Sequence, residues 1–277
     1  MIWIALAALL LAALVCFLVW PGRALPAQKA AFAGVNCAHR GLHTKDKAVP
    51  ENSLAAFRAA VDAGYGMELD IQLSKDGAVV VFHDDTLERV CGVRGRVDAF
   101  TLQQLGEMRL CGTAERIPLF TEVLDAVAGR APMIVELKNG PRNDELCEKG
   151  LRLLRGYQQR YPQAAFCVES FDPRIVAWFR KNAPDILRGQ LAHPAKEYAH
   201  MSFPLRFALA NLLGNAAARP QFVAYEYGPK APGARLCEAL GAVRVCWTVR
   251  SAADGDAAQR QNDTVIFEHY RPAPRWR

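Results

Sequence analysis

The sequence predicts a (β/α)₈ barrel, the TIM-barrel architecture, preceded by one transmembrane helix. From residue 33 onward, short β-like runs alternate with amphipathic helical stretches, which is typical of a mainly parallel sheet. Polar residues follow the ends of early and middle strands, where α/β barrels build their sites; an open doubly wound sheet would not bring both sets together. The 277 residues suffice for one such barrel, which needs about 250.

Residues 1–20 form an apolar run without a charged side chain. A helix of 20 residues is about 30 Å long, which matches the hydrocarbon core of a bilayer. We therefore expect a membrane anchor over 1–20, a linker over 21–32 and one large folded domain over 33–277. A cleaved signal peptide is the alternative, but no basic region precedes the run, and the run is longer than an ordinary signal-peptide core.

Basic residues follow the anchor segment and none precedes it; they are Arg23, Lys29, Arg40, Lys45 and Lys47. The positive-inside rule therefore predicts that the large domain is cytoplasmic. The net charge is +6, but no basic run with interleaved aromatic residues accompanies it, so we expect no nucleic-acid partner. The eight cysteines include no CxxC pair, which argues against a zinc site or a disulfide framework.

Nine short apolar runs are the expected strands. They cover residues 34–38, 66–73, 79–83, 133–138, 166–170, 186–190, 222–225, 243–249 and 264–267. The expected helices fill most of the intervals between them, at 53–63, 121–128, 144–161, 173–182, 198–213, 233–240 and 251–260.

One interval, residues 84–117, interrupts the alternation of strands and helices. It contains several turn-forming residues and a short helix-like stretch at 102–108. A plain connection of this length would be unusual in a compact domain. We therefore expect a small insertion over the mouth of the barrel.

Charged and imidazole side chains recur in or just after four of the expected strands. They are His39 and Arg40, Glu68 and Asp70, His83, and Glu136 and Lys138. A charge beside an apolar run costs free energy unless it is paired, binds a metal or takes part in chemistry. Side chains two residues apart on a strand share a face, so Glu68 and Asp70 point the same way.

The residue types in these segments indicate a metal site beside an acid-base pair. Three carboxylates without cysteine suit Mg²⁺ or Ca²⁺ better than zinc. Two histidines can serve as base and acid because imidazole titrates near neutral pH. A divalent cation, Arg40 and Lys138 would supply four positive charges against three from the carboxylates, which leaves room for one anionic group such as a phosphodiester.

The chain resembles the glycerophosphodiester phosphodiesterase family in six segments: AHRG at 38–41, PENSLAAF at 50–57, GYGMELDIQLSKDG at 64–77, VVFHDDTLERV at 80–90, IPLFTEVL at 117–124 and IVELK at 134–138. The resemblance implies metal-dependent hydrolysis of a glycerophosphodiester to glycerol 3-phosphate and an alcohol. It also implies roles for seven residues: catalysis for His39 and His83, metal binding for Glu68, Asp70 and Glu136, and phosphate binding for Arg40 and Lys138.

The second half of the chain resembles the family less closely. Residues 246–249 look like its WTV strand, in which Trp247 would line the glycerol pocket. The last strand departs from the family's pattern, because Glu268 stands where a Thr-Asp pair is common. We expect this departure to leave the core chemistry intact and to concern the far end of the substrate.

Two other functions compete with hydrolysis of small diesters. A lysophospholipase D-like or lyase reaction on membrane lysophospholipids is the main alternative, favoured by the anchor and by the arginines of the insertion. A non-catalytic, membrane-tethered binding module is the other. That reading requires a missing catalytic residue, and none is missing here.

Overall fold

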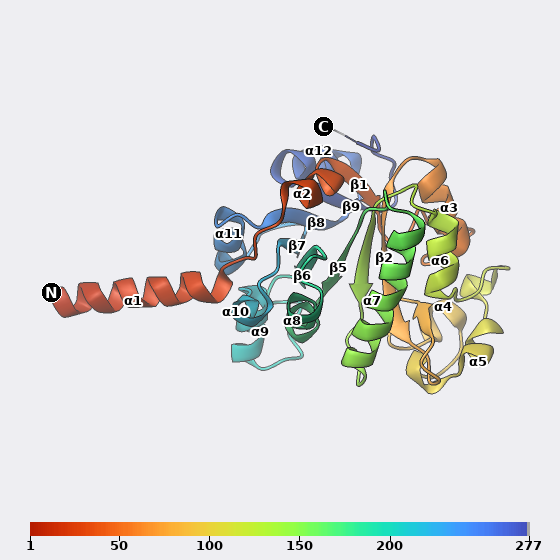
Figure 1. Ribbon diagram of the computed structural model, residues 1–277, viewed down its shortest axis with the longest axis horizontal. Coiled ribbons are helices and arrows are strands. Elements are labelled where there is room, and N and C mark those ends of the chain that lie inside the picture. The colour runs from red at the N-terminus through yellow and green to blue at the C-terminus, as the bar shows by residue number, and fades with distance from the viewer. Residues whose placement is uncertain (276–277) are drawn as a thin grey trace.

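Eight parallel strands form a closed barrel in the computed structural model, which describes residues 1–275 (Figure 1). The ring runs in the order β1, β9, β8, β7, β6, β5, β4, β2, and β1 also pairs with β2, which closes it. The strands are β1 (Val35–Ala38), β2 (Gly66–Leu73), β4 (Met133–Leu137), β5 (Phe166–Ser170), β6 (Arg188–Ala192), β7 (Phe222–Glu226), β8 (Val243–Val249) and β9 (Thr264–Phe267). The predicted TIM barrel is confirmed.

The remaining strand lies outside the ring. β3 (Val79–Val81) pairs antiparallel with β2 after a tight turn, in which Gly77 has a φ of 80°. β6 begins at Arg188, two residues later than expected. The amide of Ile186 donates to the carbonyl of Ala183 and closes a turn there instead.

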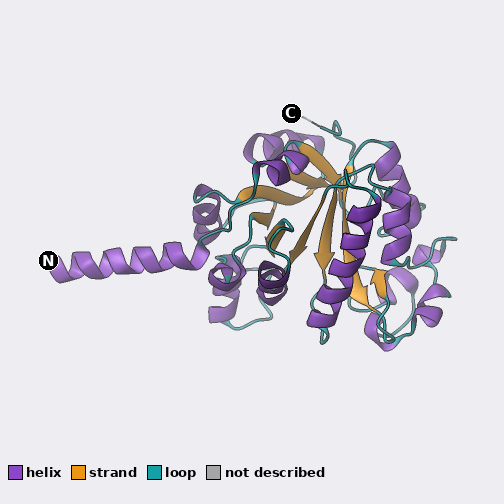
Figure 2. Cartoon of the chain, in the orientation of Figure 1, coloured by secondary structure: helices purple, strands orange, loops and turns teal. Residues whose placement is uncertain are grey.

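Helices surround the barrel (Figure 2). They are α3 (Leu54–Asp62), α6 (Phe120–Val127), α7 (Asn143–Arg160), α8 (Pro173–Asn182), α9 (Phe203–Ala210), α10 (Asn215–Ala218), α11 (Pro232–Ala239) and α12 (Ala252–Gln261). The single helix expected over 198–213 is wrong. Pro204 has no amide hydrogen and is tolerated only in the first turn of a helix, so α9 begins at Phe203 and the preceding residues form turns.

Inward-facing side chains form an apolar layer and a polar layer inside the barrel. The apolar layer includes Val35, Ile134, Cys167, Phe222 and Val245. Gly189 leaves room for it, since a Cβ there would lie 2.0 Å from the ring of Phe222. On β4, Glu136 follows Ile134 by two residues, and on β5 Glu169 follows Cys167 in the same way. The strand period of two therefore puts carboxylates at the C-terminal end of an apolar core.

The insertion after β3 has an apolar cluster of its own. Its short helices are α4 (Glu88–Cys91), η1 (Val97–Ala99), α5 (Leu102–Gly106) and η2 (Leu110–Gly112). Leu87, Val97 and Leu105 are fully buried in that cluster together with Val80 from β3. Figure 1 shows α4 and α5 beside the ends toward which the strand arrows point. The insertion therefore lies next to the mouth of the barrel.

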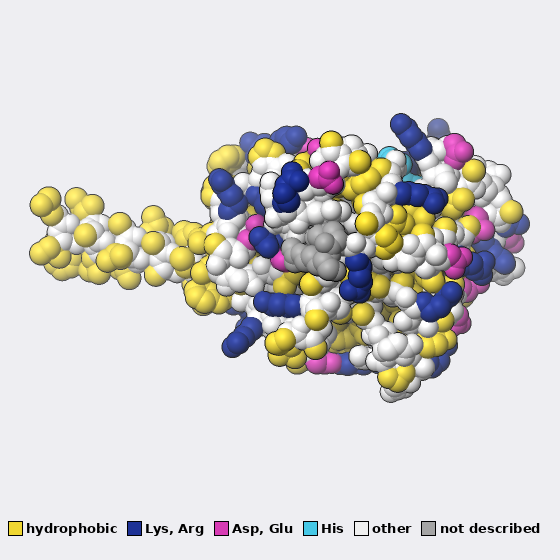
Figure 3. Space-filling model, turned by 90° about the horizontal axis from the view of Figure 1, so that it is seen from above, with side chains coloured by type: hydrophobic (Ala, Val, Ile, Leu, Met, Phe, Trp, Pro, Cys, Tyr) yellow, Lys and Arg dark blue, Asp and Glu magenta, His cyan; other side chains and the backbone are white. Residues whose placement is uncertain are grey.

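Helix α1 (Ile2–Val19) projects from the side of the barrel (Figure 1). It is long and apolar enough to cross a membrane, and Figure 3 shows hydrophobic side chains over its visible surface. Only its last residue, Val19, is buried against the barrel domain.

The segment 21–32, expected to be a linker, contains helix α2 (Pro26–Phe32). Phe32 is buried in the apolar layer of the barrel, and its carbonyl accepts a hydrogen bond of 2.7 Å from the hydroxyl of Thr264 on β9. This segment is therefore packed against the N-terminal end of the barrel and is not an extended connection between α1 and the barrel.

Candidate active site

Three carboxylates meet at the C-terminal end of β2 and β4. Asp70 and Glu136 are direct partners in the parallel register of these strands, and Glu68 lies on the same face of β2. Oxygen atoms of the three side chains lie within 4.8 Å of one another, and all three residues are buried. Burial, together with the neighbouring carboxylates, raises the pKa of Glu68 well above its usual range. Such a cluster needs a positive charge at its centre.

The cluster offers the donor set that a hard divalent cation requires. All of its ligand atoms are carboxylate oxygens, and Oδ1 of Asp70 is buried with no hydrogen-bond partner among residues 1–275. Lys138 is the nearest cation, with Nζ 2.8 Å from Oε1 of Glu136 and 3.5 Å from Oδ1 of Asp70. Burial opposes ionisation of Asp70, but the charges of His83, Lys138 and Arg40 hold its pKa well below its usual range.

Residues of the loop after β1 orient these carboxylates. The amide group of Asn52 donates to Oδ2 of Asp70 over 2.8 Å, and the backbone N–H of Arg40 donates to Oε2 of Glu68 over 3.0 Å. The next residue, Gly41, has a φ of 78°, and a Cβ there would lie 2.8 Å from that of Ala56. The tight turn at Gly41 therefore requires glycine and brings the Arg40 amide to the cluster.

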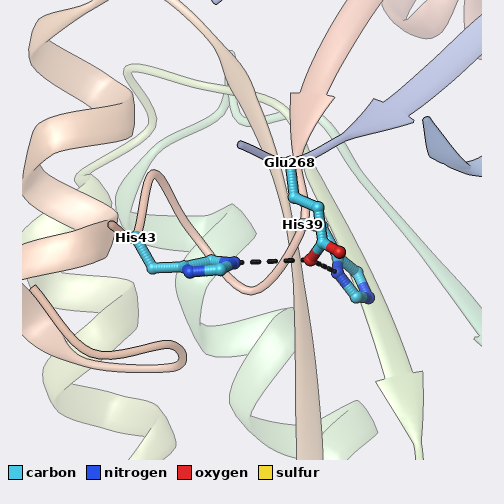
Figure 4. Close-up of side chains that lie close together, drawn as sticks. All are labelled: His39, His43 and Glu268. Carbon is cyan, nitrogen blue, oxygen red and sulfur yellow. Dashed lines mark hydrogen bonds and ion pairs between the residues drawn. The ribbon is translucent and has the colours of Figure 1, made fainter. Parts of the chain in front are cut away.

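His39 follows β1, and its ring is held by a carboxylate that follows the neighbouring strand β9. Its Nδ1 lies 2.8 Å from Oε2 of Glu268, directly after β9, while Nε2 of His43 lies 3.5 Å from the same oxygen (Figure 4). A carboxylate only accepts, so Nδ1 of His39 carries the hydrogen, while Nε2 lies 3.9 Å from Oε2 of Glu68, beyond hydrogen-bond distance. Burial lowers the pKa of His39 to about 4. This imidazole is therefore neutral at pH 7 and can accept a proton at Nε2.

His83 repeats this arrangement on the other side of the cluster. Its Nδ1 lies 2.6 Å from Oδ1 of Asp84, so its Nε2 is also free. Arg89 of the insertion bonds Oδ2 of Asp84 over 2.5 Å and Oε1 of Glu51 over 2.6 Å. Glu51 also accepts from Arg40 over 2.6 Å. A continuous set of ion pairs thus joins the insertion to both His83 and Arg40.

A pocket of about 290 Å³ opens above the carboxylates. Its polar side includes His39, Arg40 and His83, and its far wall is aromatic, with Phe171, His193 and Trp247. The Trp247 ring stands edge-on to Phe171 at 5.5 Å between centroids. One side of the pocket can therefore hold an anion and the other an apolar or polyol group.

The structure brings all eight predicted site residues to one place. Six line the pocket, and Asp70 and Lys138 lie directly beside them. Sequence reasoning missed Glu268, because the departure at the last strand was expected to affect the far end of the substrate. That expectation is wrong, since Glu268 contacts His39. Asn52, which donates to Asp70, was also not predicted from the sequence. Its position in the family-like segment at 50–57 was the available signal for a role in the site.

This arrangement defines a class: a (β/α)₈ barrel with a carboxylate cluster for a divalent cation and two histidines at its mouth. The chain matches the model of the glycerophosphoryl diester phosphodiesterase family over residues 39–269, and it belongs to that family.

Several known proteins are similar to this chain. A glycerophosphodiester phosphodiesterase of Caldanaerobacter subterraneus subsp. tengcongensis is 32% identical over 56% of this chain and 65% of its own length. A lysophospholipase D of Rattus norvegicus is 33% identical over 48% of this chain and 45% of its own length. The chain therefore spans less than two thirds of these relatives.

Solved structures have the same fold. An Oleispira antarctica phosphodiesterase in complex with the product sn-glycerol-3-phosphate superimposes with a TM-score of 0.69 at 22% identity, covering 86% of this chain and 94% of that one. A glycerophosphodiester phosphodiesterase of Thermotoga maritima has a TM-score of 0.62 at 26% identity, covering 84% and 93%.

Proposed function

We propose that this protein hydrolyses glycerophosphodiesters to glycerol 3-phosphate and an alcohol. One observation carries the proposal. Two histidines, each held at Nδ1 by a carboxylate, line a pocket beside three buried carboxylates, and the Nε2 atom of each is available for proton transfer. Family membership and the product bound to the Oleispira antarctica relative support the same substrate class.

Glu68, Asp70 and Glu136 would hold the divalent cation, Mg²⁺ or Ca²⁺, in the proposed enzyme. When bound, that ion supplies polarisation of the phosphate and neutralises the charge that develops on it. Arg40 lines the polar side of the pocket and Lys138 lies directly beside it, and both would bind the phosphate oxygens. Trp247 and the aromatic wall would contact the glycerol or alcohol moiety.

The two histidines would move the protons. The free Nε2 of one takes a proton from the attacking hydroxyl, either water or the 2-hydroxyl of the glycerol. The other ring must enter with hydrogen on both nitrogens, and it gives its Nε2 proton to the departing alkoxide. If a cyclic phosphate forms first, the roles are exchanged when water opens it. Glu268 and Asp84 accept from Nδ1 of the two rings, so that Nε2 is the atom that gains or loses the proton in each transfer.

The test is the release of glycerol 3-phosphate from glycerophosphocholine by the full-length protein supplied with a divalent salt. His39→Ala and His83→Ala should each lower kcat by about 100-fold or more, because one proton transfer is lost. His200→Ala is the matched control, since His200 is exposed and outside the pocket. Undiminished turnover in either of the first two variants rejects the acid-base pair.

Residues 1–20 would anchor this catalytic unit, 33–277, in a membrane, with the barrel on the cytoplasmic side. The exposed apolar surface of α1 supports the anchor, and the basic residues that follow it support the orientation. Labelling of the half-buried Cys91 with a membrane-impermeant thiol reagent tests the side. In right-side-out vesicles Cys91 should react only after the membrane is opened.

A second candidate is cleavage of lysophospholipids. The anchor and the similarity to a lysophospholipase D of Rattus norvegicus favour it. Phosphorus NMR of reactions with lysophosphatidylcholine and with glycerophosphocholine separates the two substrates. A cyclic phosphate that persists as the final product would identify a lyase.

A further inference from the structure

Helix α9 exposes an unusual number of large apolar side chains. Within residues 26–275 the exposed large hydrophobic residues are Phe203, Leu205, Phe207 and Tyr227, and the first three lie on α9. Phe203 is 66% exposed, and its ring stacks on Phe207 at 6.2 Å between centroids. Apolar residues scattered singly over a surface need no explanation, whereas a group on one short helix indicates an interaction surface.

This apolar helix lies next to the base of α1. Val19, the last residue of α1, is buried in one cluster with Leu212, two residues beyond the end of α9, and with Ala192 at the end of β6. α1 packs against α10 and α11. Figure 1 shows α9, α10 and α11 along the side of the barrel from which α1 projects. A bilayer entered by α1 would therefore face α9.

Arginines accompany both apolar segments. The guanidinium of Arg219 donates to the carbonyl oxygens of Phe17 and Trp20 at 2.8 and 2.9 Å, and it lies 4.6 Å from the centre of the Phe17 ring. Arg206 lies 5.3 Å from the centre of the Phe203 ring. Cations beside exposed aromatic rings are typical of segments at the level of lipid headgroups, where the apolar part is buried and the charge meets anionic lipid.

The same helix is connected to the wall of the pocket. His193, in the aromatic wall, stands edge-on to the buried Tyr198 at 4.3 Å between ring centroids. Tyr198 belongs to the turns that lead directly into α9. The distance along the chain from the pocket to the exposed apolar side chains is therefore only ten residues, from His193 to Phe203.

We propose that α9 docks on the bilayer that α1 enters, with Phe203, Leu205 and Phe207 inserted among the lipid headgroups. Docking places the aromatic side of the pocket beside the lipid surface. The enzyme can then cleave the phosphodiester of lysophospholipids in the membrane as well as soluble glycerophosphodiesters. This inference rests on the proposed anchor and on the proposed hydrolysis. It assigns substrate delivery to a surface separate from the catalytic groups.

Lipid photo-crosslinking tests the docking without relying on activity. The full-length protein is reconstituted in vesicles of phosphatidylcholine and phosphatidylglycerol that contain a diazirine phosphatidylcholine, and adducts are mapped by mass spectrometry. We expect adducts on α1 and on the peptide with Phe203 and Phe207, and none on α5 of the insertion. Adducts on α1 without any on α9 overturn the docking; absence of both overturns the anchor as well.

Turnover of two substrates tests the consequence for delivery. The triple variant Phe203→Gln, Leu205→Gln, Phe207→Gln removes the exposed apolar groups and keeps good helix formers. Its rate on lysophosphatidylcholine in vesicles should fall about tenfold, since the lost apolar contacts weaken docking. Its rate on free glycerophosphocholine should stay unchanged.

Equal losses on both substrates, or none on either, overturn substrate delivery through α9. If the unsubstituted protein cleaves neither substrate, the proposed hydrolysis fails. The crosslinking result then decides the docking by itself, so the two failures are distinguishable.

Discussion

Glu268 fixes the orientation of His39 across the seam where the barrel closes, through a contact of 2.8 Å between Oε2 and Nδ1. The two residues follow β1 and β9, which are neighbours in the ring although 229 positions separate them in the chain. The other oxygen of Glu268 accepts from Arg250 over 2.5 Å. Burial would raise the pKa of Glu268, but the hydrogen bond from His39 and nearby charges hold it well below its usual range. The carboxylate is therefore ionised at neutral pH.

Glu268→Gln should lower kcat by about 100-fold, because the amide can accept or donate and no longer enforces the tautomer with Nε2 free. KM should change little, since Glu268 does not line the pocket. Steady-state kinetics on glycerophosphocholine measures both. Arg250→Gln is the matched control, because Arg250 touches the other oxygen, and it should have a much smaller effect. A rise in KM with an unchanged kcat would show that Glu268 does not act through His39.

Removal of divalent metal should abolish turnover, and the carboxylate cluster should account for the loss. Treatment with EDTA followed by Mg²⁺ or Ca²⁺ should restore activity. Asp70→Asn should lower bound metal, measured by elemental analysis, and kcat by about 100-fold or more. Asp62→Asn, at an exposed position on α3, serves as the control. Full metal content in the Asp70 variant would contradict the assignment of this ligand.

Arg89→Ala should reduce kcat/KM by about tenfold, which is the usual scale for a residue that supports others in a site. Loss of this guanidinium releases Asp84, which holds His83, and Glu51, which holds Arg40. Arg96→Ala is a control within the same insertion, because among residues 1–275 Arg96 forms ion pairs only with Asp85 and Asp98. Equal effects of the two substitutions would mean that the insertion as a whole, rather than Arg89, supports the site.

Asp172→Ala should destabilise the fold by about 1 kcal/mol at pH 7, because the side chain caps α8 by accepting from the amide of Arg174 over 2.9 Å. Burial opposes ionisation of Asp172, but hydrogen bonds from Arg174 lower its pKa. A lowered pKa in the folded state means that the charge stabilises above the unfolded pKa of about 4 and that this stability is lost as the pH falls below it.

The measurement for Asp172 is urea unfolding in detergent at pH 7 and at pH 3. The difference between the unsubstituted protein and Asp172→Ala should shrink at the lower pH. Asp172→Asn retains a capping group without the charge, so its stability relative to Asp172→Ala should not depend on pH. A constant difference for all variants would rule out an ionised cap.

Local patterns in the sequence were sufficient for most of the fold. The strand periods of two and the helix stops at Gly64 and Gly129 reflect interactions within a few residues, and the expected elements there agree with α3, α6 and the barrel strands. The error at α9 also concerns a local pattern. Pro204 marks the first turn of a helix, whereas the expected helix over 198–213 placed it in the interior.

By itself the sequence determined the order of the strands, the side chains that share a face and the chemical types available at the strand ends, because these depend on neighbours in the chain. Tertiary structure alone decided which distant residue holds each of the proposed catalytic groups. Glu268 meets His39 only because the ring closes between β9 and β1, and the end of α1 meets the segment after α9 only because Val19 and Leu212 are buried in one cluster. Contacts across a closure depend on the three-dimensional path of the whole chain, which no local periodicity encodes.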